Sequence, residues 1–331
     1  MSYLLSLLEK SPIPDGKTAV DALRHSVKLA QRAEELGYHR FWLAEHHGNA
    51  QLASAAPEIV AAHVLAKTSL LRVGTGGVML QHYSPYKVAE VFRQLAALAP
   101  GRVDAGVGKA PGGLPLSTRA LQRRHAGASD FEPLLAELDG FLRDELATGH
   151  PLAGAVATPV VSSAPQRILL GGSPDSAALA AKYGWDFTFA GHFNGDAANL
   201  QATLDTYRQA SGKTAALALY AFAAASRAEA EAQVGQLRIF KLHPESGQAV
   251  NLPSLAAAEQ YARQAGIRSY RIEELSPHVI TGNGEDVRRQ LDALHQRYGI
   301  HEFIIDNPVA DFARRLTSIE LIAGADIAVA A

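Results

Sequence analysis

The sequence of 331 residues contains no cysteine. Disulfide bonds, thiolate metal sites and cysteine nucleophiles are therefore excluded. The sequence also has no His-Glu-x-x-His motif, and its first apolar stretch ends in Leu8-Glu9-Lys10, without the His-x-His of a barrel hydrolase. A metal-dependent hydrolase is consequently a weak hypothesis, and we predict no resident metal. No Gly-x-Gly-x-x-Gly fingerprint stands between a strand and a helix, so a bound nicotinamide dinucleotide is not indicated either.

The sequence also has no large excess of positive or negative charge. Its 31 Lys and Arg residues are offset by 33 Asp and Glu residues, which gives a formal net charge of −2. This balance gives no electrostatic reason to expect nucleic acid or an anionic membrane as a partner. The first ten residues have no basic segment, and their apolar run is too short for a signal peptide or a spanning helix. We therefore expect a soluble cytoplasmic protein.

Short apolar runs alternate with segments that have helical spacing along the whole chain. This pattern predicts a (β/α)8 TIM barrel as one domain over residues 1–331, with an open doubly wound sheet as the structural alternative. The predicted strands span residues 3–8, 40–44, 71–75, 103–107, 167–170, 186–190, 215–224 and 302–306. The predicted helices span residues 17–36, 55–68, 85–98, 119–146 with an interruption around Gly127, 177–183, 197–211, a segment from 227, 284–298 and 310–323.

The segment 239–277 lies between the seventh and the eighth predicted strand and is an expected insertion that covers the barrel mouth. Its first part, residues 239–256, shows no clear periodicity, and we expect it to be irregular.

The second predicted strand runs directly into Glu45-His46-His47. Sites on barrels are built where strands end, and neighbouring side chains point in opposite directions, so one histidine can face the cavity while the other packs outward. A histidine there could act as a general acid or base. Two structural histidines that bond the rim backbone are an equally good interpretation.

Three further strand ends have features of a ligand site. Gly171-Gly172-Ser173-Pro174-Asp175-Ser176 opens a helix with bare backbone and two hydroxyls, which favours a phosphate, although an ordinary Ser-Pro helix cap would look the same. Lys109 and Arg119 follow the fourth strand and could pair with that phosphate, or they could be solvated surface charges. Gly76-Gly77 after the third strand suits a flat ring, or a bulge or tight turn.

Three stretches combine into a more specific pattern, and they are FWLAEHHG (residues 41–48), RVGTGGVML (72–80) and PGRVDAGVGKAPG (100–112). Together they resemble the bacterial luciferase-like monooxygenase family. The resemblance covers most of the chain and implies a flavin-dependent barrel that binds reduced FMN at its mouth, reacts with O2 and oxygenates a small organic substrate, such as an aldehyde-like or apolar compound. It also implies a separate flavin reductase that supplies FMNH2, and a homodimer.

The resemblance also assigns roles to individual residues. His46 matches the catalytic histidine, for which we expect proton transfer, and His47 matches a second histidine of the same site. Gly76 and Gly77 match a segment with a non-proline cis peptide beside the flavin ring. The expected phosphate ligands are Lys109, Arg119, Gly172, Ser173 and Ser176.

The sequence departs from the family pattern in three places. Lys109 stands where relatives usually have arginine, which puts FMN affinity in question because lysine cannot form a planar two-pronged clamp. Tyr83 replaces a family histidine, and residues 239–277 match no family segment. Two alternatives stay open: the deazaflavin F420 could replace FMN and give hydride transfer, or the protein could bind flavin without catalysis.

Overall fold

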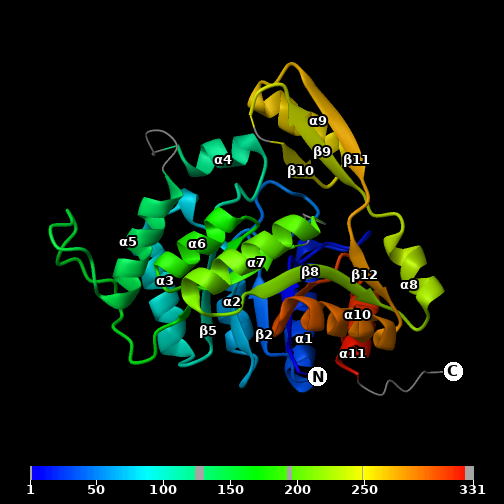
Figure 1. Ribbon diagram of the computed structural model, residues 1–331, viewed down its shortest axis with the longest axis horizontal. Helices are drawn as coiled ribbons and strands as arrows, with labels where there is room; N and C mark the ends of the chain where they lie inside the picture. The colour runs from blue at the N-terminus through cyan, green and yellow to red at the C-terminus, as the bar shows by residue number, and fades with distance from the viewer. Residues whose placement is uncertain (1, 124–129, 192–195, 248, 325–331) are drawn as a thin grey trace.

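A closed barrel of eight parallel strands forms the centre of the molecule (Figure 1). The computed structural model describes residues 2–123, 130–191, 196–247 and 249–324. Each strand pairs with the next, and the last strand returns to the first. In order around the barrel the strands are β1 (Leu4–Glu9), β2 (Arg40–Leu43), β3 (Arg72–Thr75), β5 (Val103–Gly108), β6 (Gln166–Gly171), β7 (Asp186–Ala190), β8 (Ala216–Ala223) and β13 (Glu302–Asp306). The barrel prediction is confirmed, and the open sheet is excluded.

Apolar side chains fill the inside of the barrel, as expected for a packed barrel core. This interior cluster consists of Leu8, Trp42, Ala44, Ile168, Ala218 and Ile304. Two short strands extend the mouth end, with β4 (Val78–Met79) paired to β5 and β12 (Val279–Gly282) paired to β8.

Helices cover the outside of the barrel (Figure 1). Sequence-encoded caps set their ends; at the first helix, for example, Thr18 and Asp21 form a reciprocal capping box. The helices are α1 (Ala19–Glu35), α2 (Pro57–Leu65), η1 (Leu80–His82), α3 (Pro85–Leu98), α4 (Pro115–Leu121), α5 (Phe131–Arg143), α6 (Pro174–Lys182), α7 (Ala197–Ser211), α8 (Arg227–Val234), α10 (Gly284–Tyr298) and α11 (Phe312–Ala323).

The helix predicted over residues 119–146 is wrong in its limits. The chain forms α4 and α5 instead, and α5 ends where Asp144 takes a left-handed conformation with φ 58°. Gly127, where we expected the interruption, lies outside the described residues.

The insertion between β8 and β13 is a small ordered unit of its own. It contains β9 (Ile239–Pro244), β10 (Val250–Leu252), α9 (Leu255–Ala265) and β11 (Tyr270–Leu275), with the three strands in an antiparallel sheet. Its core consists of Leu242, Leu252, Ala258 and Ala262. The expectation that residues 239–256 are irregular was wrong, because these strands are short and bury few side chains, which leaves little periodicity in the sequence.

The insertion rests on α4, the helix that follows the carboxyl end of β5 (Figure 1). Leu114 packs against the core of the insertion. The side-chain oxygen of Gln264 accepts a hydrogen bond from the backbone N–H of Leu116 at 3.0 Å, and its carbonyl accepts one from Arg119 Nη1 at 2.9 Å. The insertion is therefore fastened to the mouth side of the barrel.

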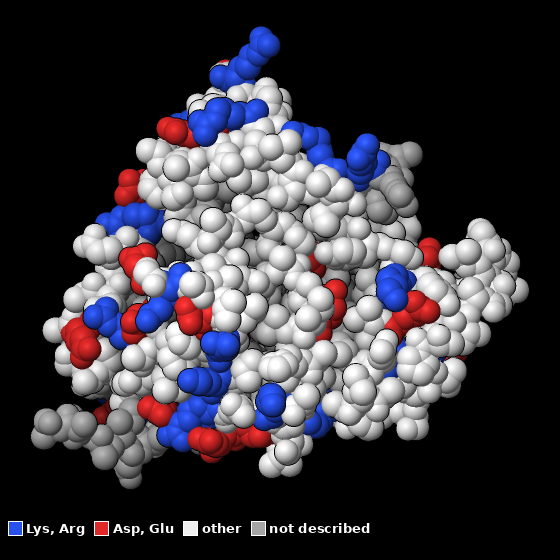
Figure 2. Space-filling model, turned by 180° about the vertical axis from the view of Figure 1, so that it is seen from behind, with Lys and Arg blue, Asp and Glu red and all other residues white. Residues whose placement is uncertain are grey.

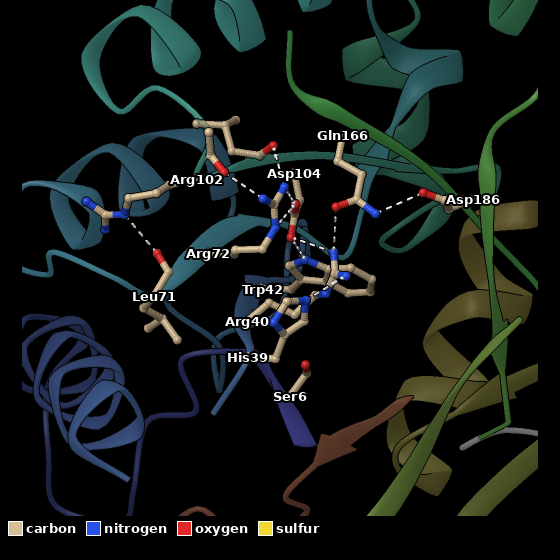
Figure 3. Close-up of polar contacts among 12 residues, drawn as sticks. Ser6, His39, Arg40, Trp42, Leu71, Arg72, Arg102, Asp104, Gln166 and Asp186 are labelled. Atoms are coloured by element: carbon tan, nitrogen blue, oxygen red, sulfur yellow. Dashed lines mark hydrogen bonds and ion pairs between the residues drawn. The ribbon is translucent and has the colours of Figure 1, made fainter. Parts of the chain in front are cut away.

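A network of charged side chains closes the opposite, amino end of the barrel (Figure 3). Asp104 is fully buried and accepts hydrogen bonds from Arg40 at 3.0 Å, from Trp42 Nε1 at 2.9 Å and from two nitrogens of Arg72 at 2.5 and 3.0 Å. Arg40 Nε also donates to Glu302 at 2.6 Å. Each charge in this basal network is met by an opposite charge, which offsets the cost of burying it.

The surface carries no broad field of one sign on the face seen in Figure 2, where basic and acidic side chains lie side by side. Within the part of the chain that the structure describes, no helix is both long and apolar enough to cross a bilayer.

Candidate active site

A cluster of polar side chains lies at the carboxyl end of β2. Glu45 is buried, and its Oε1 lies 2.6 Å from His47 Nε2 and accepts a hydrogen bond from the Tyr83 hydroxyl at 2.8 Å. Its other oxygen accepts a hydrogen bond from the backbone N–H of Met79 at 3.0 Å. The imidazole of His47 and the phenol of Tyr83 are thus held on one carboxylate. The backbone of His47 is also held by the segment that follows β5, because its N–H donates a hydrogen bond to the carbonyl of Gly112 at 2.7 Å.

Burial and the charge of Glu45 favour the protonated forms of neighbouring groups at this cluster. Burial raises the pKa of the Tyr83 phenol, and the charge of Glu45 raises it further. Burial also raises the pKa of Glu58, and the Glu45 carboxylate adds to that shift while His47 opposes it. Tyr83 therefore stays protonated at neutral pH and remains a donor to Glu45.

The two histidines occupy different surroundings. His47 is anchored by Glu45, whereas the backbone N–H of His46 donates to the carbonyl of Ser54 at 3.1 Å, and the His46 residue is half-buried. His46 follows the interior residue Ala44 by two positions, just beyond the end of β2, and continued alternation would place its side chain on the cavity side.

Bare backbone forms part of the floor of the mouth. The Gly76–Gly77 peptide bond is cis. A Cβ atom at Gly76 would lie 2.7 Å from Leu8 Cδ1, and one at Gly77 would lie 2.9 Å from the Gly106 carbonyl and from Leu170 Cδ1. Only glycine fits at these two positions, so the chain after β3 lies directly on the barrel core and presents no side chain above it.

A cavity of about 810 Å³ joins β5 to the start of α6. Lys109 and Ser176 both line it, together with Asp175 and the Glu132–Lys182 ion pair. At the start of α6, the Ser173 hydroxyl accepts a hydrogen bond from the backbone N–H of Ser176 at 3.3 Å and lies 3.2 Å from its hydroxyl oxygen.

The start of α6 fits a phosphate. A Cβ atom at Gly172 would meet nothing within 4 Å, so the backbone there is open to a ligand. The Ser176 hydroxyl and Lys109 on this cavity, with the Ser173 hydroxyl and the amino terminus of α6 beside it, supply the donors and positive potential that an anion needs. Three carboxylates on the cavity wall, those of Asp130, Glu132 and Asp175, keep this potential modest.

Arg119 is not brought to this cavity. It is absent from the lining residues and instead donates to Gln264 in the insertion. The sequence suggested that Arg119 binds the phosphate, because it follows the same strand as Lys109. In the structure, however, Arg119 lies on α4 and its side chain points toward α9.

The sequence also left the role of Glu45 unassigned. Its place two residues before His47 puts both side chains on one side of an extended chain, and this spacing could have identified the pair. No cluster of three or more potential metal ligands occurs among the residues that the structure describes.

The sequence matches the family model described as luciferase-like monooxygenase over residues 1–301. The chain belongs to the luciferase-like monooxygenase family. The chain is 42% identical over 329 residues to the N-acetyl-S-alkylcysteine monooxygenase of Bacillus subtilis (strain 168), with 98% of each chain covered. The crystal structure of apo-MsnO8 superposes with a TM-score of 0.76 at 31% identity and covers 97% of both chains.

More distant members of this fold bind different cofactors. The oxygenating constituent of 3,6-diketocamphane monooxygenase in complex with FMN has a TM-score of 0.70 at 17% identity and covers 98% of this chain and 97% of its own. An F420-dependent secondary alcohol dehydrogenase has a TM-score of 0.68 at 16% identity and covers 98% of both chains. The predicted family and fold are confirmed, and the chain is a flavin-dependent monooxygenase by family.

Proposed function

We propose that this chain is the oxygenase of a two-component system, which takes FMNH2 from a separate reductase and transfers one oxygen atom of O2 to a small organic substrate. The observation that supports a phosphate-bearing flavin is the cavity shared by Lys109 and Ser176, beside the open backbone of Gly172, and the monooxygenase family favours FMN. When bound, reduced FMN supplies the electrons for O2, one oxygen atom of which goes to the substrate while the other leaves as water.

The protein's own residues have distinct tasks in this proposal. Lys109, Ser173, Ser176 and the backbone of Gly172 hold the phosphate. The side-chain-free backbone of Gly76–Gly77 would leave room for the flat ring. His46 moves a proton where the substrate reacts, while Glu45 fixes the orientation of His47.

The substrate proposal has two branches. A relative that acts on N-acetyl-S-alkylcysteines makes N-acetyl-S-methylcysteine a suitable first probe. An aliphatic aldehyde represents the aldehyde-like or apolar class. We also propose a cytoplasmic homodimer that associates through α2 and α3, for which the exposed side chain of Ile59 on α2 is one candidate contact. Light scattering of wild type and Ile59→Asp tests that interface.

Hydride transfer with F420 is the second candidate function, and it is favoured by the fact that F420 also carries a phosphate and by the F420-dependent enzyme of the same fold. Anaerobic titration with FMNH2 and, separately, with reduced F420 distinguishes the two. Oxygen-18 gas is then admitted with each probe. Tight FMNH2 binding and one labelled oxygen atom in the product support the monooxygenase. Binding of F420 alone, without oxygen uptake, supports hydride transfer, and FMN binding without turnover of either probe supports a flavin-binding protein.

A further inference from the structure

Three polar side chains form a layer on the wall of the mouth made by β8, β13 and β1. Leu8, Ala218 and Ile304 belong to the interior cluster, and Lys10, Tyr220 and Asp306 follow them by two residues each. Side chains two apart on a strand share a face, so this trio is the next layer above the core. The strand register agrees, because Asp306 is level with Leu8 on one side and with Tyr220 on the other.

The residue between Leu8 and Lys10 confirms the alternation. Glu9 points outward, where it is fully buried and bonds to Ser26 on α1 and Arg315 on α11. Its charge is therefore satisfied behind the wall and does not compete for Lys10.

Lys10 is the exposed member of the layer. Its Nζ lies 2.8 and 2.9 Å from the two carboxylate oxygens of Asp306 and 5.0 Å from the centre of the Tyr220 ring. The Asp306 side chain is 1% exposed, whereas that of Lys10 is 22% exposed. A ligand entering the mouth would thus meet the Lys10 side chain and not the Asp306 carboxylate.

Lys10 is charged at neutral pH. Burial on its own would lower the pKa of Lys10, but the charge of Asp306 and the neighbouring Tyr220 outweigh burial and raise it. An ammonium group has three N–H donors; Asp306 Oδ2 accepts one and the Tyr220 hydroxyl takes a second, which leaves one donor for a ligand.

The position of this layer relative to the phosphate site is set by the strand order. Around the ring of eight strands, β1 stands four strands from β6, which is the opposite wall. Lys10 and the phosphate site proposed after β6 therefore belong to opposite walls, and a small substrate bound between these walls would present one end to Lys10.

We infer that Lys10, backed by Asp306 and Tyr220, binds the carboxylate of the substrate, so that the preferred substrates are small organic acids. This inference rests on the proposed function and deepens it. An amine would be a poor ligand, because the Asp306 carboxylate is only 1% exposed and already forms an ion pair with Lys10. A carboxylate gains charge-assisted hydrogen bonds from Lys10 without displacing Asp306.

The test compares the binding of N-acetyl-S-methylcysteine with that of its carboxamide, which lacks only the charge. Calorimetry is done without oxygen, both with and without FMNH2, so that no turnover occurs and a failure to bind flavin does not hide the acid site. We expect wild type to bind the acid about 10- to 100-fold more tightly than the amide, as typical of a hydrogen bond between charged groups. The Lys10→Met variant should lose that preference while its affinity for the amide stays within about twofold.

A second variant serves as a control in case the Lys10→Met variant does not fold. Lys10→Met combined with Asp306→Asn removes both charges and leaves no unpaired buried carboxylate. It should also lose the acid preference and should keep the FMNH2 affinity of wild type. Equal loss of acid and amide binding would indicate a structural ion pair and overturn the inference, as would an acid preference that survives both variants or a wild type that binds neither probe. Loss of FMNH2 binding in wild type bears on the proposed function alone.

Discussion

The two ends of the barrel use similar residues in opposite ways. At the amino end, Asp104 is saturated by Arg40, Arg72 and Trp42, so the protein itself satisfies the charge (Figure 3). At the carboxyl end, Lys10 keeps 22% of its side chain exposed, and Gly172 leaves open space beside its backbone. Charge at a strand end is therefore no guide to function by itself, and the informative property is whether donor capacity is left for a ligand.

The largest effect is expected for a substitution at the carboxyl end of the barrel, where it should reduce turnover. His46→Ala should lower turnover by about 10²- to 10⁴-fold, the usual contribution of a positioned acid or base, and should leave FMNH2 affinity nearly intact. Stopped-flow kinetics with saturating FMNH2 measure the turnover rate, and anaerobic titration measures the FMNH2 affinity. His243→Ala in the insertion, where the imidazole pairs with Glu273, is the matched control. Wild-type turnover in His46→Ala would remove the proton-transfer role.

At the amino end the corresponding loss is of stability. Asp104→Asn leaves Arg40 and Arg72 without a shared carboxylate in a buried site, so the free energy of unfolding should fall by about 3–5 kcal/mol. Urea unfolding followed by circular dichroism measures it. The control is Asp205→Asn on α7, whose exposed ion pair with Arg208 is worth less than about 1 kcal/mol. Similar losses in the two variants would show that the basal network contributes no special stability.

The phosphate site should respond more weakly. Replacing Ser173 and Ser176 together with alanine removes two hydroxyl donors, and FMN affinity should drop about 10- to 100-fold. Riboflavin has no phosphate, so its affinity should change by less than about twofold. Isothermal titration of both flavins gives the comparison, and parallel losses would move the phosphate elsewhere.

The smallest effect concerns Glu58 beside the Glu45–His47 pair. Burial and Glu45 raise its pKa in the folded state above the usual 4.5, so the folded protein binds this proton more tightly than the unfolded chain. Stability is therefore lost as the pH rises through that window, and Glu58→Gln should stabilise the protein at pH 7 by less than about 1 kcal/mol and hardly at pH 4. Thermal unfolding at both pH values measures this difference. A larger gain in stability at pH 4 than at pH 7 would contradict a raised pKa of Glu58 in the folded state.

Much of the barrel could be predicted because local sequence marks its elements. Pro85 opens α3 and the Asn283 cap precedes α10, and both helices have the predicted limits. Strands β9 and β10 each bury only one side chain, and no such local signal identifies them. Their pairing depends on a core that is complete only when α9 packs on the sheet.

The site was predictable in part, for a similar reason. Strand ends identified Lys109 and Ser176, which the structure places on one cavity. The direction of Arg119 depends on how α4 packs against the insertion, and the Lys10–Asp306 pair joins residues 296 apart through strand register. Neither follows from local spacing.

The attachment of the insertion to α4 has a thermodynamic consequence. The segment between Lys109 and α4 is held at Gly112 by the backbone of His47, and α4 is held by Gln264. A displacement of the insertion is therefore shared with the loop that bears Lys109. If Lys109 holds the flavin phosphate as proposed, a ligand that favours one position of the insertion changes flavin affinity, and flavin changes the affinity for that ligand by the same factor.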